Sequence, residues 1–379
     1  VMPQTVEHLD IMRLLNIKRG IIVITKSDMV EEDWLELVED DIRTACIGTF
    51  LEDAPAIAVS SHTGSNIEQL RSMIFEMIGT LQERNTDPGL LRIPIDRVFT
   101  IACFGTVITG TLTQGMVQVG QEVMIYPQGL MARVRNLQVH NRMVEQAYAG
   151  QRTAVNLTGV KKEEIDRGNV LAFRNSIQPT SLIDVKLEMR PYSNRDLNSG
   201  DKVLFYYGSS ETLCKISLLD KELLTAGNSC YAQLFFDEEI AVKKNDYYVI
   251  RYFSPVETIG GGFVLDANPR KHRKKDTGVV EALRIRETGD DTAVLEQALK
   301  DSSRFFTEPA ALAKQVGMAQ ADAFARLKQL QQQGRAVLLP SGTYVHEEYC
   351  LQAEQNALRI VKEFHQANPL LWGMPKEER

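Results

Sequence analysis

The chain has 379 residues, of which 44% are hydrophobic and 25% charged, as in ordinary globular proteins, and this length allows two to four domains. No apolar run approaches the ~20 residues that cross a bilayer, and no charged-then-apolar leader opens the sequence, so a cytoplasmic protein without membrane contact is expected. The net charge is −7, but residues 1–87 hold 7 Lys/Arg against 16 Asp/Glu, so any nucleic-acid surface is expected after this acidic segment.

Five cysteines lie far apart, with no CxxC pair and no histidine at ligand spacing. They are expected to be ordinary buried thiols in a reducing compartment, and no metal site is predicted. These cysteines are Cys46, Cys103, Cys214, Cys230 and Cys350.

Residues 1–82 alternate between helical and extended patterns. Strands that alternate with helices form parallel sheets, so this segment is predicted to be an α/β domain. Helices are predicted at 5–15, 31–47 and 67–81, and strands at 20–25 and 56–59.

Two β-rich segments follow a polar linker at 83–89, and each is predicted to be a closed β-barrel, at 83–176 and 177–269. Turn residues that tolerate positive φ separate short strands, which is typical of small barrels. The turn glycines are predicted to be Gly105, Gly110, Gly115, Gly120, Gly150 and Gly159. The strands are predicted at 98–100, 106–109, 122–126, 153–157, 182–187, 202–207, 211–218, 229–236 and 247–252.

From residue 270 the apolar period becomes helical, and a hairpin follows the helices. This order predicts an α+β winged-helix domain at 270–350 and the start of a second one at 351–379. Its core residues are predicted to be Leu312, Val316, Phe324, Leu327 and Leu330. The helices are predicted at 292–299, 309–316 and 320–333, and the hairpin strands at 336–339 and 343–345.

Thr25-Lys26-Ser27-Asp28 directly follows the strand at 20–25. An aspartate at the carboxyl end of a sheet strand can accept from N1–H and the exocyclic amine of guanine, whereas adenine presents no such donor pair. The four residues by themselves also fit a solvated turn. The tetrapeptide resembles the NKxD guanine motif of GTPases, with Thr25 in place of the usual asparagine.

Ser60-Ser61-His62 ends the strand at 56–59 and resembles the SA(K/L) guanine loop of the same proteins. The two motifs lie one helix and one strand apart, as neighbouring strand ends of a doubly wound sheet require. His62 is given no catalytic role. Together the motifs predict a guanine site formed by Thr25, Lys26, Asp28, Ser60, Ser61 and His62.

The phosphate half of such a site is absent, because no GxxxxGK occurs in the sequence. Val1–Leu9 resembles the helix of the second switch, so residues 1–82 are expected to be the C-terminal part of a P-loop GTP-binding domain. Val1 opens the chain without an initiator Met, and we expect an internal fragment of a longer protein. The resemblance implies a parent GTPase that binds GTP/GDP, with its Mg²⁺ ligands in the missing N-terminal part. The fragment holds no catalytic residue and is not expected to hydrolyse GTP by itself.

The first predicted barrel resembles the second domain of translational GTPases of the EF-Tu type. The similar segments are "GTVITGTLTQG" at 105–115, "VGQEV" at 119–123 and "GVKKEEIDRG" at 159–168. The resemblance implies that the two barrels help to bind aminoacyl-tRNA.

General EF-Tu ends after its two barrels, whereas this chain continues into winged-helix sequence. "SPVETIGGGFVLDANPRKHRK" at 254–274 and "GMPKEE" at 373–378 resemble the selenocysteine-specific elongation factors, the SelB family. The resemblance implies a monomeric cytoplasmic factor that delivers selenocysteinyl-tRNA to the ribosome at a recoded UGA codon. Further winged-helix units beyond Arg379 are expected to read the mRNA hairpin.

Two alternatives stay open. The chain could belong to another tRNA-carrying translational GTPase, such as EF-Tu or an initiation-factor-gamma-like protein, although these lack the winged-helix extension. In this truncated form it could also act only as a non-catalytic adaptor that binds RNA or protein.

The predicted selenocysteine pocket consists of Asp96, Arg97 and Arg152. General EF-Tu has two acidic residues where this chain has Asp96-Arg97, and asparagine where it has Arg152. A selenol ionises at neutral pH and the hydroxyl of serine does not, so cationic donors can separate the two by charge. Asp96 would orient one arginine.

The alternative is that Asp96 and Arg97 form a surface ion pair and that Arg152 is a charge at the barrel rim. Some relatives place a histidine near Phe104, where Cys103-Phe104 stands here, which puts a third polar contact in doubt.

The run "RKHRKK" at 270–275 is the main basic cluster. It is predicted to contact RNA phosphates through Arg270, Lys271, Arg273 and Lys274. A solvated linker is the competing interpretation.

Overall fold

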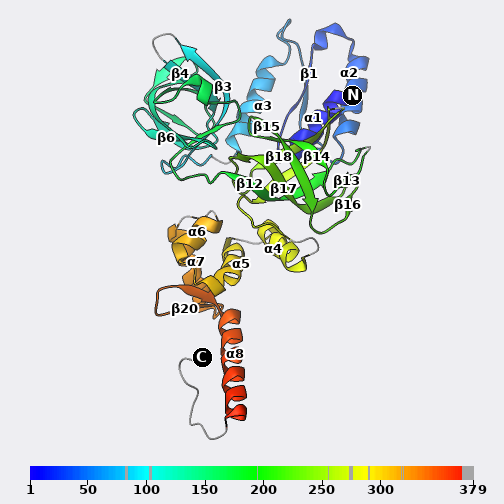
Figure 1. The fold of residues 1–379 in the computed structure, drawn as a ribbon. Coiled ribbons are helices and arrows are strands. Elements are labelled where there is room, and N and C mark those ends of the chain that lie inside the picture. Colours follow the sequence, from blue (N-terminus) through cyan, green and yellow to red (C-terminus); the bar gives the residue numbers. More distant parts are fainter. Residues whose placement is uncertain are drawn as a thin grey trace. The chain divides into compact units, whose positions relative to one another are not determined.

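A computed structural model describes residues 1–81, 84–101, 105–193, 195–254, 256–272, 276–288, 291–316, 318 and 320–368. The chain forms two compact units, residues 1–275 and 276–379, which are described separately (Figure 1). None of the helices in the described ranges combines the length and the apolar character that a membrane span requires.

The first unit begins with an α/β segment. Strands β1 and β2 pair in parallel, with Thr25 opposite Val59, as the alternating pattern predicts. Leu9, Ile22, Cys46 and Ala54 form a small buried core between this two-stranded sheet and the helices. The elements are α1 (Pro3–Leu14), β1 (Ile22–Thr25), α2 (Glu32–Cys46), β2 (Ala56–Val59) and α3 (Ile67–Gly79).

A first β-barrel follows, in the strand order β11-β6-β7-β10-β4-β3, and pairing of β11 with β3 closes the ring. Ile93, Ile108 and Val155 are fully buried inside it. The strands are β3 (Leu91–Ile101), β4 (Gly105–Thr111), β5 (Gln114–Gln118), β6 (Glu122–Tyr126), β7 (Leu130–Val139), β8 (Arg142–Val144), β9 (Gln146–Tyr148), β10 (Arg152–Thr158) and β11 (Val170–Ala172).

The turn prediction is wrong for Gly110, which lies inside β4 and does not have a positive φ. A side chain at this position would overlap the carbonyl oxygen of Pro94, so glycine is needed for close approach of two backbones. The other five predicted turn glycines do have positive φ angles.

The second barrel closes in the order β12-β17-β15-β14-β18-β19. Strands β13, β16 and β19 are missing from the predicted strands. In β19, Gly260-Gly261-Gly262 gives a weak strand signal. Side chains there would overlap backbone carbonyls of β12 and β18, so the glycines permit the closure. The strands are β12 (Thr180–Met189), β13 (Leu197–Asn198), β14 (Lys202–Tyr207), β15 (Ser210–Leu218), β16 (Leu223–Leu224), β17 (Ser229–Ile240), β18 (Tyr247–Phe253) and β19 (Val256–Asp266).

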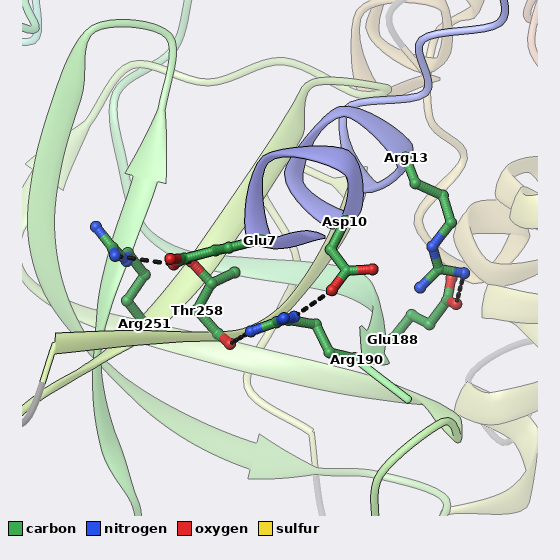
Figure 2. Close-up of polar contacts among 7 residues, drawn as sticks. All are labelled: Glu7, Asp10, Arg13, Glu188, Arg190, Arg251 and Thr258. Carbon is green, nitrogen blue, oxygen red and sulfur yellow. Dashed lines mark hydrogen bonds and ion pairs between the residues drawn. The ribbon is translucent and has the colours of Figure 1, made fainter. Parts of the chain in front are cut away.

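Polar contacts join helix α1 to the second barrel (Figure 2). Glu7, Asp10 and Arg13 recur every third residue, so they share one face of the helix. Their partners lie on β12, β18 and β19, except Arg190, which directly follows β12. Arg251 Nη2 on β18 lies 3.0 Å from Glu7 Oε1, and Thr258 Oγ1 on β19 donates to the same oxygen at 2.7 Å. Arg190 Nε donates to Asp10 at 2.6 Å, and Arg13 Nη1 donates to Glu188 on β12 at 2.7 Å.

The second unit has the helix order and the hairpin of a winged helix. Leu312, Leu327 and Leu330 are fully buried, as predicted, but Phe324 is 44% exposed. Ala323, Leu327 and Leu330 share the inner face of α7, so the residue next to Ala323 points outward. The elements are α4 (Thr277–Thr288), α5 (Asp291–Ser302), α6 (Pro309–Val316), α7 (Gln320–Gln332), β20 (Ala336–Leu338), β21 (Tyr344–His346) and α8 (Glu347–Ala367).

Helices α4 and α8 are absent from the predicted elements, as are strands β5, β7, β8, β9 and β11 of the first barrel. Helix α8 is a continuous helix that begins before residue 351, where a further domain was expected to start. The segment "GMPKEE" at 373–378 lies outside the described residues.

Candidate functional sites

The predicted guanine residues lie at one edge of the parallel sheet. Because Thr25 pairs with Val59, the segments that begin at Lys26 and Ser60 leave the sheet side by side. Asp28 lies in a short 3₁₀ turn that follows Lys26, whose φ of 61° turns the chain sharply. The topology therefore brings the two motifs together.

The predicted guanine residues differ in burial and in hydrogen bonding. Ser60 is fully buried, and its Oγ accepts from the backbone N–H of Thr63 at 3.2 Å, so it shapes the loop. Ser61 is exposed, and so is His62, whose Nδ1 lies 4.0 Å from Asp28 Oδ2. Within the described residues, the Asp28 carboxylate accepts no hydrogen bond, so its oxygens can accept from a ligand.

The second candidate site lies on the outside of the first barrel. Arg152 at the start of β10 forms a bidentate pair with Asp96 of β3, with Nη1–Oδ2 and Nη2–Oδ1 distances of 2.5 and 3.1 Å. Thr109 on β4 donates to Asp96 Oδ1 at 2.7 Å. The pairing of β3 with β4 shifts register between Ile95 and Arg97, which places Asp96 at the irregularity.

Charges around Asp96 favour its ionised form. Partial burial raises the pKa of this carboxyl, but hydrogen bonds from Arg152 and Thr109 and the charges of Arg152 and Arg97 outweigh burial, so the pKa is lowered overall. The same contact raises the pKa of Arg152. Arg152 stays about half exposed and Arg97 is also exposed, so both guanidinium groups face solvent beside a fixed carboxylate.

The sequence did not single out Thr109, although its contact completes the arrangement. Arg97 and Ala154 both pair with Thr109 across the neighbouring strands, so Thr109 lies between β3 and β10. A β-branched hydroxyl in an alternating strand gives no signal of such a role, because threonine is common in strands.

The basic segment is only partly described. Arg270 and Lys271 are exposed, whereas Arg273 and Lys274 lie outside the described residues. Gln233 on β17 donates to the carbonyl oxygen of Arg270 at 3.0 Å and accepts from the backbone N–H of His272 at 3.1 Å. These contacts attach the segment to the barrel wall.

Asp184 on β12 is a buried acid that the sequence analysis missed. His272 Nε2 lies 2.7 Å from Asp184 Oδ2, and Gln233 donates to Asp184 Oδ1 at 2.7 Å. Burial raises the pKa of Asp184, against the hydrogen bond and charge of His272. The partners are 88 residues apart in the chain, so no local pattern links them.

Three family models match the chain. The "Elongation factor Tu GTP binding domain" matches residues 1–80 and "Elongation factor Tu domain 2" matches residues 105–172. The "Selenocysteine-specific elongation factor, beta-barrel domain" matches residues 183–271.

Curated relatives agree with these matches. The chain is 42% identical over 275 residues to the selenocysteine-specific elongation factor of Desulfomicrobium baculatum, an alignment that covers 72% of this chain and 43% of that protein. It is 27% identical over 352 residues to the factor of Escherichia coli (strain K12), covering 93% and 53%. The chain thus spans about half the length of these relatives.

Solved structures of the same factors are also similar. The crystal structure of bacterial selenocysteine-specific elongation factor EF-Sec matches all of this chain and 59% of its own, with a TM-score of 0.75 and 25% identity. The apo form of SelB from Methanococcus maripaludis matches 70% of this chain and 62% of its own, with a TM-score of 0.63. The chain belongs to the selenocysteine-specific elongation factor family.

Proposed function

We propose that this chain is part of a translation elongation factor that binds GTP and selenocysteinyl-tRNA and delivers the tRNA to the ribosome at a recoded UGA codon. The bidentate Asp96–Arg152 pair beside Arg97 carries the specific part of this proposal. It fixes one guanidinium group and leaves both arginines facing solvent, as a pocket for an anionic group requires.

The base-reading part of the proposal rests on Asp28. Its carboxylate would accept from the two guanine donors, while the Lys26 stem would pack along the base and the loop that begins at Ser60 would border it. The phosphate and Mg²⁺ ligands of such a factor belong to motifs that this sequence does not contain. The family members bind GTP and Mg²⁺ in general, so GTP/GDP is the cofactor that we propose for the parent protein.

The remaining parts of the proposal concern partners. Arg270 and Lys271, together with Arg273 and Lys274, would contact RNA phosphates, and Gln233 would hold this segment against the barrel. We also propose that the parent protein acts as a cytoplasmic monomer and that further winged-helix units read the mRNA hairpin.

Charge selection by Arg152 is tested by the change Arg152→Asn in the full-length protein that contains this chain. The substitution removes a charge-assisted donor worth about 1.5–3 kcal/mol. Affinity for selenocysteinyl-tRNA should therefore fall about 10- to 150-fold, because 1.4 kcal/mol is a factor of ten. Affinity for seryl-tRNA should barely change, since a neutral hydroxyl gains little from the arginine.

The measurement is the pair of dissociation constants for the two tRNAs at one salt concentration, with a non-hydrolysable GTP analogue bound. Arg142→Asn, at an exposed arginine of the same barrel, is the matched control. Equal weakening of both tRNAs by Arg152→Asn would show that Arg152 holds the tRNA end or the barrel rim instead.

A further inference from the structure

The second barrel contacts strand β3 of the first barrel directly beside Asp96. The turn between β14 and β15 contains Ser209, whose Oγ donates to the carbonyl oxygen of Ile95 at 2.8 Å. The same carbonyl accepts from the backbone N–H of Gly168, also at 2.8 Å. Two donors from outside β3, one of them from the other barrel, therefore fix the peptide that leads into Asp96.

This contact is closely packed. A side-chain Cβ at Gly208 would lie 3.4 Å from Cβ of Pro94, the residue before Ile95. A Cβ at Gly168 would lie 2.6 Å from Cβ and Oγ of Ser210. Both glycines have positive φ, which side chains rarely adopt. The position of Gly168 leaves no room for a side chain beside Ser210, whereas the distance at Gly208 is an ordinary van der Waals contact.

A second contact holds the same strand from the second barrel. Arg92 on β3 forms a bidentate ion pair with Asp246, between β17 and β18, and the two side chains are only 10% and 18% exposed. Strand β3 is thus attached to the second barrel at Arg92 and at Ile95, on the segment that leads to the Asp96 irregularity.

The geometry of Asp96 depends on this segment. The register of β3 against β4 shifts between Ile95 and Arg97, and such irregularities re-aim the side chain that they carry. A bidentate ion pair requires a defined direction as well as a defined distance. A displaced Ile95 peptide would turn the Asp96 carboxylate away from Arg152.

We propose that Ser209 is a positioning residue for the Asp96–Arg152 pair, so that the second barrel sets the anion selectivity of the first. The claim about tRNA selectivity rests on the proposed function. The claim that Ser209 positions the ion pair rests on the hydrogen bonds to the carbonyl oxygen of Ile95. Among the described residues, Ser209 forms no hydrogen bond with Arg97 or Arg152; its own carbonyl oxygen accepts from Nε of Arg167 at 3.2 Å. It acts through the backbone of β3.

The first test uses this chain and needs no tRNA. The guanidinium N–H signals of Arg152 are identified by NMR from their loss in Arg152→Asn and compared among Ser209 variants. Ser209→Ala, which removes the donor, should shift these signals and speed their exchange with water. Ser209→Thr keeps a hydroxyl and should restore them.

Ser193→Ala is the matched control, because Ser193 is also half-buried in the second barrel and its hydroxyl donates to a backbone carbonyl, that of Arg195, at 3.0 Å. This variant should leave the Arg152 signals unchanged. Unchanged Arg152 signals in Ser209→Ala would overturn the proposal, whatever role Arg152 has.

The second test measures tRNA selectivity in the full-length protein. Ser209→Ala should weaken selenocysteinyl-tRNA binding about 3- to 10-fold, the usual effect of one lost hydrogen bond, and leave seryl-tRNA binding unchanged. Ser209→Thr should keep the wild-type ratio of the two affinities. Equal weakening of both tRNAs would overturn the selectivity part.

The two proposals fail in different ways. If Arg152→Asn lowers the affinity ratio and Ser209→Ala does not, the positioning role is wrong and the charge-selecting pocket stands. If Arg152→Asn leaves the ratio unchanged, the pocket is wrong, while shifted Arg152 signals in Ser209→Ala would still support the structural part.

Discussion

Two aspartates of the first unit face different electrostatic surroundings. Asp96 is bound by Arg152 and Thr109, so most of its acceptor capacity is used inside the protein. Asp28 lies 4.0 Å from His62 Nδ1, beyond hydrogen-bond distance, at the open edge of the sheet. Asp96 is therefore suited to orienting another side chain, and Asp28 to accepting hydrogen bonds from a ligand.

The change Asp28→Asn tests the base-reading role in the full-length protein. The amide introduced at position 28 would present an N–H donor to the exocyclic amine of guanine, which is itself a donor, so GTP binding should weaken. Xanthine has an acceptor oxygen in place of that amine, so the variant should bind xanthosine triphosphate. A site built to hydrogen-bond a ligand rejects an analogue without those groups by roughly 10⁴-fold, which sets the selectivity that can be lost. Nucleotide dissociation constants measure the effect, with Asp40→Asn on the exposed side of α2 as the control. Unchanged GTP affinity together with continued rejection of xanthosine triphosphate would contradict the role of Asp28.

Helix α1 is the element that joins the α/β segment to the second barrel. Leu9 belongs to the buried cluster of the α/β segment, while Glu7, Asp10 and Arg13 contact the barrel (Figure 2). Asn16, three residues further, donates to the hydroxyl of Tyr247 at 2.5 Å. Because the helix presents two acids and then a base to partners of opposite charge, only one register of the helix on the barrel satisfies all the pairs.

This junction should depend on pH through Glu7. A hydrogen bond from Thr258 is the largest influence on its pKa, and with the charge of Arg251 it outweighs partial burial and lowers the pKa from the ordinary value of 4.5. A lowered folded-state pKa means that the stabilisation is present above the unfolded-state pKa and is lost as the pH falls through the folded-state value. The window therefore lies below about pH 4.5.

The variant Glu7→Gln isolates this contribution. It should be less stable than the wild type at neutral pH, and the difference in the free energy of unfolding should vanish as the pH falls through that window. Denaturant unfolding of the 379-residue chain between pH 3 and 7 measures the difference. Glu36→Gln, at an exposed acid on α2, should show no comparable change. A Glu7→Gln difference that persists unchanged at pH 3 would contradict the assignment.

At the scale of the whole molecule, the chain joins an α/β segment, whose sheet edge is the proposed guanine site, to two barrels, and its sequence has no GxxxxGK phosphate-binding motif. Phosphoryl transfer depends on electrostatic stabilisation of the transferred group, and a single arginine finger is worth about 10³–10⁵ in rate. The purified 379-residue chain should therefore release no inorganic phosphate from GTP above the buffer level. Release that persists after further purification would contradict this expectation, and release by the full-length protein serves as the positive control.

Much of the fold could be predicted from periodicity. Alternating strands and helices give the α/β segment, and repeated strands with turn glycines give two closed barrels. Periodicity gave wrong predictions at glycines whose role is to let a backbone that is distant in the sequence approach closely. Gly110 and the three glycines of β19 look like turns or breaks, but they lie where neighbouring strands leave no space for a side chain. The prediction that Phe324 is a core residue is wrong for a local reason, because one step along a helix turns a side chain by 100° about the helix axis.

The sequence by itself determined the residue types of both candidate sites. Motifs beside strand ends predicted Asp28 and the loop that begins at Ser60, and the comparison with general EF-Tu that the resemblance allows predicted Asp96, Arg97 and Arg152. Local patterns suffice for the first set, because a strand end or a turn is encoded by adjacent residues, whereas the second set depends on the family resemblance.

Only the tertiary structure decided which of these residues meet. Asp96 and Arg152 are 56 residues apart, and their pairing depends on closure of the barrel and on the register shift in β3. Ser209 lies 114 residues from Ile95, and Arg251 lies 244 residues from Glu7. Contacts at such separations form when whole elements pack, so no stretch of neighbouring residues contains the information that would predict them.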